Sequence, residues 1–223
     1  LTSIFSLLVK LAMDVDKHAT GFERKMKMTH TEASFLVQEM HMAASLSGDL
    51  AVRGERMVES QNNLSEATGL MNLRSMDTLI TFTKLTEKIG LSAKSAAGLE
   101  MMSKVMGKNF DQQRKDTAMV VNHLAASKGL LVDESKIMEE VGQTTGQVAA
   151  NLGNNPVEIA KAVTQAQVLG TTLDKVAASA NKLLDFEGSI SQELEAELLV
   201  GRDLNLERAR ALALAGDQAG FAK

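Results

Sequence analysis

Apolar side chains recur at alternating spacings of three and four along the first part of the chain. The positions that define this seam are Leu8, Leu11, Val15, Phe22, Met26, Leu36 and Met40. Such alternation is typical of a coiled coil. It predicts a long coiled-coil-like helix over residues 1–68, roughly 90 Å long at ~1.5 Å per residue if it is continuous. A helix of that length cannot bury its stripe against itself, so we expect self-association into a homo-oligomer of a few copies, or packing against the helices that follow.

The seam also has weak positions. His18 and Thr29 place polar side chains on it, and Gly21, Gly48 and Gly54 fall within the same segment. Glycine inside a helix lowers its stability by roughly 0.5–1 kcal/mol relative to alanine. We therefore expect any bend or break of the long helix at these residues.

Beyond residue 68 the pattern changes to shorter helices. Apolar positions at helical spacing predict a helical hairpin region over residues 69–140, with helix ends at Gly90 and Gly129. Asp133 precedes the segment 134–141 at the position of a helix cap. Farther along, Ser189 and Gln192 predict a capping box that opens a helix through Leu199.

One short pattern occurs three times in the final region, residues 141–223. Each copy has an aliphatic residue, a glycine and two polar residues, followed six and seven positions after the glycine by a β-branched residue and an alanine. Glycine adopts the left-handed conformation that closes a helix, and a following Ser, Thr or Asn accepts the N–H groups of the next one. Each copy therefore predicts a helix end joined directly to a helix start. All predicted junctions are Gly90, Gly129, Gly142, Gly153, Pro156 and Gly170.

The composition agrees with helices alone. The chain is 44% hydrophobic but only 3% aromatic, with thirteen Met, no Trp and no Tyr, and Pro156 is its only proline. Thin aliphatic side chains suit contacts between helices, whereas strands favour aromatic and β-branched residues. No segment carries a strand or hairpin-turn signal. We expect an all-α, elongated and oligomeric protein.

Charge and cysteine content exclude several classes of function. A net charge of −4 and a pI near 5.6 leave no basic footprint, so sequence-specific nucleic-acid binding is not expected. The absence of cysteine excludes disulfides and thiolate metal sites. The first apolar run, from Ile4 to Met13, is too short to span a bilayer, so this piece does not support membrane contact. A chain that begins with Leu and ends directly after an apparent helix is expected to be part of a longer protein.

Candidate chemical groups have packing interpretations that fit better. The first is a cluster of soft ligands for an ion such as Cu(I), made of Met26, Met28, His30, Met40, His41 and Met42. Two of its methionines already belong to the seam, and methionine commonly fills irregular helix contacts. Gly107-Lys108 lacks the Ser or Thr and the preceding strand that a phosphate-binding loop requires.

Two further candidates lie in the second half of the chain. His123 falls on the apolar side of a predicted helix, where a lone histidine is more often structural than catalytic. A set of acidic residues is interpreted as a solvated helix face and comprises Glu187, Glu193, Glu195 and Glu197. We therefore predict no catalytic, cofactor-binding or metal site, and no enzymatic activity.

From Gly129 onward the chain resembles the helical region of bacteriophage tail tape measure proteins. The residues that carry the resemblance are the junctions Leu152-Gly153-Asn154-Asn155 and Leu169-Gly170-Thr171-Thr172, the segment 201–210, and Leu214-Ala215-Gly216-Asp217. The resemblance covers roughly the last hundred residues, and its motifs are compositional. Many members of the family carry a long transmembrane-like segment elsewhere, which this piece lacks.

The resemblance implies a structural protein of the virion tail, made in the host cytoplasm during assembly. Such a protein occupies the tail lumen and baseplate hub, sets tail length and leaves ahead of the genome. Its partners are further copies of itself, tail tube proteins and baseplate hub proteins. The alternative is a helical signalling or secretion-apparatus protein with a chemoreceptor-like coiled coil. That alternative requires one heptad frame to continue through a hairpin, whereas here the frame dissolves after about Leu64.

Overall fold

The computed structural model describes residues 2–127, 129, 133–144 and 146–221, apart from the side chains of residues 2–11, 218 and 219. Within this part of the chain the regular structure is helical and contains no strand, which confirms the all-α prediction. The helices form two compact units, Leu1–Glu100 and Met101–Lys223. The division into three regions at residues 68 and 140 stays a prediction about domains.

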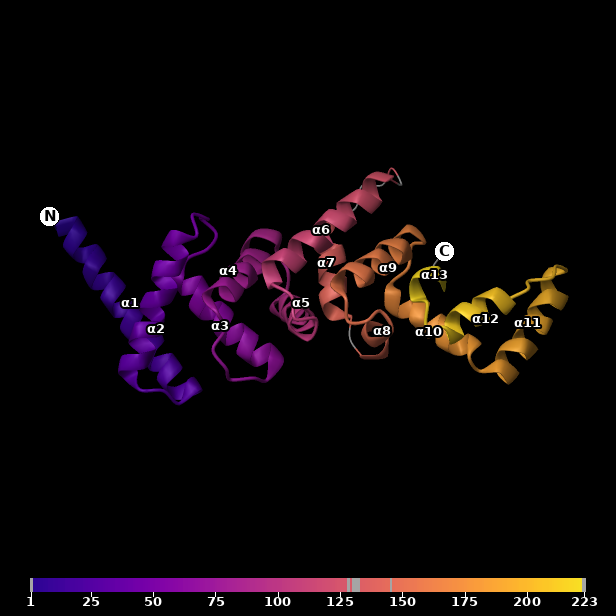
Figure 1. Ribbon diagram of the computed structural model, residues 1–223, viewed down its shortest axis with the longest axis horizontal. Coiled ribbons are helices and arrows are strands. Elements are labelled where there is room, and N and C mark those ends of the chain that lie inside the picture. Colours follow the sequence, from indigo (N-terminus) through magenta and orange to yellow (C-terminus); the bar gives the residue numbers. More distant parts are fainter. Residues whose placement is uncertain (1, 128, 130–132, 145, 222–223) are drawn as a thin grey trace. The chain divides into compact units, whose positions relative to one another are not determined.

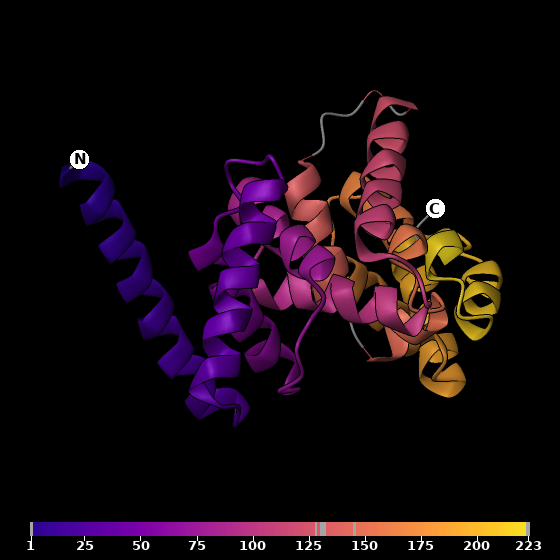
Figure 2. The same cartoon turned by 60° about the vertical axis from the view of Figure 1, so that its left-hand side comes forward.

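Unit 1 is built from helices that pack on their neighbours in the chain (Figure 1). They are α1 (Thr2–Met26), α2 (His30–Leu46), α3 (Gly54–Thr68), α4 (Met76–Lys84), the π-helix η1 (Leu85–Ile89) and the first part of α5 (Ala93–Val105). Helix α1 lies against α2, α2 against α3, and α3 against α4. Figure 2 shows that the beginning of α1 leads away from the other helices of the unit, while its end meets α2.

The expectation of one continuous helix over residues 1–68 is therefore wrong. Lys27 has a left-handed φ of 54°, which ends α1. Thr29 then forms a capping box with Glu32, because its hydroxyl accepts from the Glu32 N–H at 3.3 Å and the Glu32 carboxylate accepts from the Thr29 N–H at 2.8 Å. A second break follows α2, where Gly48 has a φ of 66°. Breaking the helix at these residues costs less free energy than keeping it continuous with its apolar stripe in water, so the chain folds back on itself.

Unit 2 is organised around helices α9 and α10. The helices of this unit, after the end of α5, are α6 (Phe110–Ser127), α7 (Glu134–Gln143), α8 (Gly146–Asn151), α9 (Pro156–Val168), α10 (Leu173–Leu183), α11 (Phe186–Val200), α12 (Glu207–Leu214) and α13 (Gln218–Phe221). Helix α9 contacts α6, α7, α10 and α13. Ile159 and Val163 of α9 are completely buried, as are Ile137 of α7 and Leu173 of α10. Aliphatic side chains thus form the centre of the unit.

The junctions around α9 have the geometry that favours glycine. Gly153 and Gly170 take left-handed φ values of 65° and 69°. Between them, Asn155 caps α9 by accepting from the Val157 N–H at 3.1 Å, and Pro156 is the first helical residue. Because both backbone reversals are tight, α8, α9 and α10 follow one another with few intervening residues.

One predicted junction needs correction. Gly142 is buried inside α7, which continues to Gln143 and is followed by the cap residue Thr144. The left-handed glycine is Gly146, with a φ of 63°, at the start of α8. The predicted helix end at Gly142 is therefore wrong, because the helix continues through this residue.

Glycine at Gly90 should stabilise unit 1 through its backbone conformation alone. Gly90 has a φ of 83° and ends η1, and an added Cβ would meet nothing within 4 Å. Gly90→Ala should therefore lower the free energy of unfolding by about 1 kcal/mol. Gly21 is the matched control, because it is exposed, has the same open space and lies within α1. Gly21→Ala should raise stability by roughly 0.5–1 kcal/mol in urea unfolding. Equal effects of the two substitutions would contradict the backbone explanation.

Candidate functional site

The seam residues that the structure describes are buried or half-buried within unit 1. Phe22, Leu36 and Met40 are at most 8% exposed, and Val15 and Met26 are half-buried. The side chains of Leu8 and Leu11 lie outside the described residues. The buried members lie on α1 and α2, which pack against one another, and α2 also packs against α3. Their burial is thus achieved within one chain, and self-association through the seam stays a prediction.

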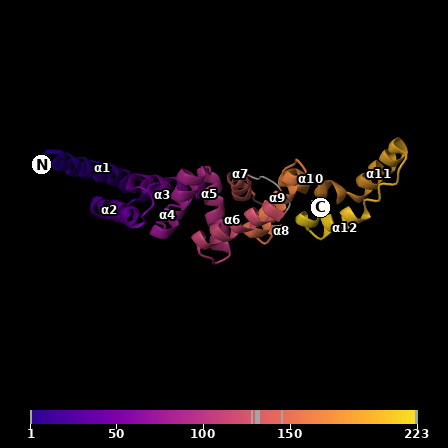
Figure 3. The ribbon, with the colours of Figure 1, turned by 90° about the horizontal axis from the view of Figure 1, so that it is seen from above.

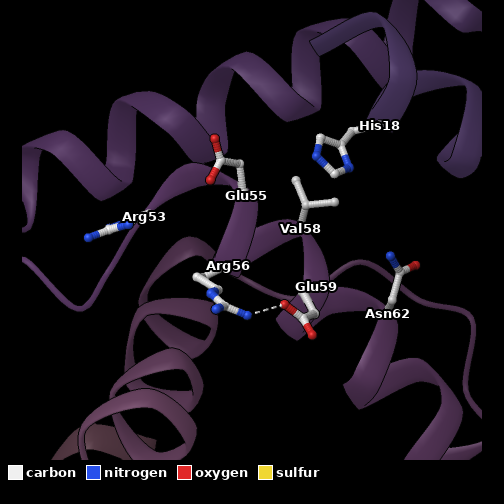
Figure 4. A pocket seen from close by; sticks show the side chains of 7 residues that line it. All are labelled: His18, Arg53, Glu55, Arg56, Val58, Glu59 and Asn62. Atoms are coloured by element: carbon white, nitrogen blue, oxygen red, sulfur yellow. Dashed lines mark hydrogen bonds and ion pairs between the residues drawn. The ribbon is translucent and has the colours of Figure 1, made fainter. Parts of the chain in front are cut away.

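A polar hollow of about 450 Å³ lies between α1 and α3. Figure 4 shows His18 reaching in from α1, while the remaining lining residues come from α3 and the residue before it. Arg56 donates to Glu59 at 2.8 Å and also pairs with Glu87 of η1 at 3.3 Å. The hollow contains no hydroxyl or thiol nucleophile among its lining side chains. One of these ionic contacts lies within α3, and the other joins α3 to η1.

One polar network of unit 1 is buried. The Arg74 Nε and Glu100 Oε1 atoms are 3.4 Å apart, and their side chains are only 3% and 1% exposed. Gln61 of α3 holds the same loop, because its amide accepts from the Arg74 N–H at 3.0 Å and donates to the Asn72 carbonyl at 3.1 Å. The network therefore attaches the connection between α3 and α4 to both α3 and α5. These partners are distant in sequence, and no local motif predicts them.

A second network joins α11 to α12 in unit 2. The Arg210 guanidinium donates to the Ser189 hydroxyl at 3.2 Å and to the Glu193 carboxylate. Glu193 also accepts from the Leu206 N–H at 2.6 Å. The Leu206 N–H, followed by Arg210, lowers the pKa of the Glu193 carboxyl below its ordinary value.

The predicted capping box at Ser189 and Gln192 is wrong. Helix α11 begins at Phe186, and its cap is Asp185, whose carboxylate accepts from the Gly188 N–H at 3.4 Å. Ser189 lies inside the helix and faces Arg210. An aspartate earlier in the chain therefore starts the helix, and the serine is used for a tertiary contact.

Other carboxylates also cap distant backbone groups. Glu140 of α7 accepts from the Leu173 N–H at the start of α10, at 2.8 Å. Glu197 of α11 accepts from the Leu204 N–H at 2.9 Å. Two members of the predicted acidic face, Glu193 and Glu197, are thus engaged with the connection that follows α11, whereas Glu187 and Glu195 are exposed.

The Met and His cluster is divided among different contacts. His30 lies between Asp16 and Glu23 of α1. Its Nε2 atom is 3.2 Å from Asp16 Oδ1, and its Nδ1 atom is 3.4 Å from Glu23 Oε2. The His41 ring packs against Gly54, where an added Cβ would come within 2.2 Å of His41 Nδ1. Met40 is buried and Met42 is exposed. In the described residues no group of three or more His, Asp and Glu side chains has an arrangement that would hold a metal ion.

His123 is also placed differently from the expectation. It is exposed on α6, whereas Thr117, Val121 and Ala125 form the buried side of that helix. The helical spacing of the apolar residues was correct, but the histidine falls outside the stripe because its position differs by two residues from both Val121 and Ala125.

Comparisons with known protein families, curated proteins and solved structures found no match to this chain. Among the described residues, no helix is long and apolar enough to cross a membrane.

Replacing Arg74 alone should destabilise unit 1 more than replacing both Arg74 and its buried partner Glu100. Arg74→Met removes the guanidinium from the buried Glu100 carboxylate and from its hydrogen bonds to Asn72 and Thr68, and should lower the free energy of unfolding by roughly 3–5 kcal/mol. Adding Glu100→Leu should recover much of the loss, because the buried charge is removed as well. The control is Lys161→Met, which breaks the exposed pair with Glu158 and should cost less than about 1 kcal/mol. A double variant less stable than Arg74→Met would contradict this assignment.

The stability of unit 2 should depend on the ionisation of Glu193. Because its pKa is lower in the folded chain than in the unfolded chain, the carboxylate stabilises the fold at neutral pH, and this contribution disappears as the pH falls through the folded-state pKa. Thermal unfolding between about pH 6 and pH 3 should show a smaller loss of stability for Glu193→Gln than for the unsubstituted chain. The exposed Glu195→Gln serves as the control. It should follow the unsubstituted chain, and parallel curves for all three proteins would refute the assignment.

Proposed function

We propose that this chain is a structural component of a bacteriophage tail, the helical region of a tape measure protein. In this proposal it occupies the tail lumen or baseplate hub, contributes to tail length and is released when the genome is ejected. Its partners are further copies of itself, tail tube proteins and baseplate hub proteins. It is made in the host cytoplasm and becomes part of the virion tail.

The use of polar side chains supports a structural role. In unit 1 the buried Arg74 ties the connection between α3 and α4 to Glu100 of α5, and in unit 2 Arg210 of α12 pairs with Glu193 of α11. A catalytic site usually needs a nucleophile or a general base directed into a cavity. The networks described above instead hold connections and helix ends in place. This observation carries the proposal of an interaction protein.

Exposed apolar side chains also support a role in assembly. Leu46 and Leu50 in unit 1 are 80% and 92% exposed, and several leucines of α11 in unit 2 are exposed as well. Contiguous exposed apolar surface commonly marks a site of protein interaction. The assignment to a phage tail comes from the resemblance of the junctions at 152–155 and 169–172 and of the segment 201–210.

The chemoreceptor-like alternative is less consistent with the arrangement of unit 1. A signalling coiled coil transmits along long helices with one heptad frame. Here the seam is interrupted at Lys27 and Gly48, and the segments on either side pack against one another.

The decisive experiment changes the length of the full-length protein in the phage that encodes it. In-frame deletion of residues 101–223 should shorten the tails, by at most about 1.5 Å for each residue removed. Electron microscopy of purified virions measures the length, and peptide mass spectrometry tests whether the chain is in the tail. A smaller shortening per residue would mean that the helices keep hairpin packing in the assembled tail.

Two controls make the result interpretable. Duplication of the same segment should lengthen the tails, because a ruler acts through its length and not through one side chain. His30→Ala, His41→Ala and His123→Ala should leave tail length and infectivity unchanged. Unchanged tails after the deletion, or a folded histidine variant without infectivity, would overturn the ruler proposal.

A further inference from the structure

Helix α11 turns its polar side toward its own chain. Ser189 is buried and Glu193 is held by Arg210 of α12 and by the Leu206 N–H. Figures 1 and 3 show α11 at an edge of unit 2, connected to α12 through an extended segment. A helix of a globular protein normally turns its apolar stripe inward. In α11 the inward positions are taken by Ser189 and Glu193, and the row of apolar side chains that follows each of them by one residue lies on the adjacent face, about 100° around the helix axis.

The apolar side chains of α11 form a continuous ridge. Its members follow one another at intervals of four residues and are Phe186, Ile190, Leu194 and Leu198. Residues four apart are neighbours on a helix surface, and such rows are the ridges that interdigitate when two helices pack. Their exposed fractions run from 45% for Ile190 to 87% for Leu198. A hollow of about 570 Å³ beside Leu194 and Leu198 offers space for a side chain of a partner, and its charged lining is two carboxylates, Glu197 and Asp203, and one cation, Arg202.

The charge of α11 selects among partners. The helix carries four glutamates and no lysine, arginine or histidine. Glu193 and Glu197 are directed to the connection with α12, whereas Glu187 and Glu195 remain exposed beside the ridge. Two copies of α11 packed ridge to ridge would bring like charges together, which is unfavourable. Lysine or arginine flanking an apolar stripe would instead complement this surface.

We propose that the α11 ridge is a docking site for an amphipathic helix of another protein, one whose apolar stripe is flanked by lysine or arginine. The ridge supplies apolar contact area, and Glu187 and Glu195 select for the basic partner. The inference does not depend on the assignment to a phage tail, because binding is measured on this chain in isolation.

The test uses two synthetic helical peptides of about 18 residues, with the same leucine stripe and either Lys or Glu on its flanks. Fluorescence anisotropy with the full chain should show at least about tenfold tighter binding of the Lys peptide. Leu194→Gln with Leu198→Gln should weaken that binding at least about tenfold. The matched control, Leu169→Gln with Leu214→Gln, changes two exposed leucines elsewhere in unit 2 and should leave binding unchanged.

Charge reversal tests the selectivity separately. Glu187→Lys with Glu195→Lys should invert the preference, so that the Glu peptide binds more tightly than the Lys peptide. Equal binding of both peptides, or binding unaffected by the changes at Leu194 and Leu198, would overturn the proposal. A concentration-dependent dimer in sedimentation that dissolves in the Leu194→Gln, Leu198→Gln variant would assign the ridge to a second copy and would also overturn it. Circular dichroism checks that each variant retains its helix content.

Discussion

Burial of narrow aliphatic stripes is the constraint on which this structure depends. Helices built from Ala, Leu, Val and Met cover little apolar area each, so every one of them needs neighbours on its apolar side. Left-handed residues between the helices allow the chain to supply those neighbours itself. Lys27 and Gly48 reverse the chain around α2, and Gly153 and Gly170 do so around α9. The result is two compact units, each with a buried apolar core.

Polar side chains hold the helices and loops in place after the chain has reversed. Arg74 and Glu100 hold the loop between α3 and α4, and Glu140 caps α10 from α7. A buried charge pair contributes little net stability compared with apolar residues, but it is costly to break. Such pairs therefore favour one arrangement of the helices over others. In α11 Arg210 holds Ser189 and Glu193 on the inward face, and the apolar ridge on the adjacent face stays exposed.

Charged and apolar side chains are used in different ways. The charged groups of the two networks hold helices and connections together, as Glu193 shows. The apolar groups are divided between internal packing, as at Met40, and exposure, as at Leu198. A role in assembly makes use of both features. It needs helices held in defined positions, and it needs apolar surface available to another chain.

The sequence by itself determined the all-α class, the cap at Asp133 and the reversals at Gly153 and Gly170, because these follow from backbone preferences of single residues and of residues a few positions apart. Only the tertiary structure decided where the seam of residues 1–68 is buried, since a helical stripe indicates that a partner is needed without indicating which one. The same limit applies to Gly142 and Ser189, whose local patterns were outweighed by packing. It applies most strongly to α11, whose orientation depends on Arg210, a residue that lies beyond the helix in sequence and meets it only after the chain has turned.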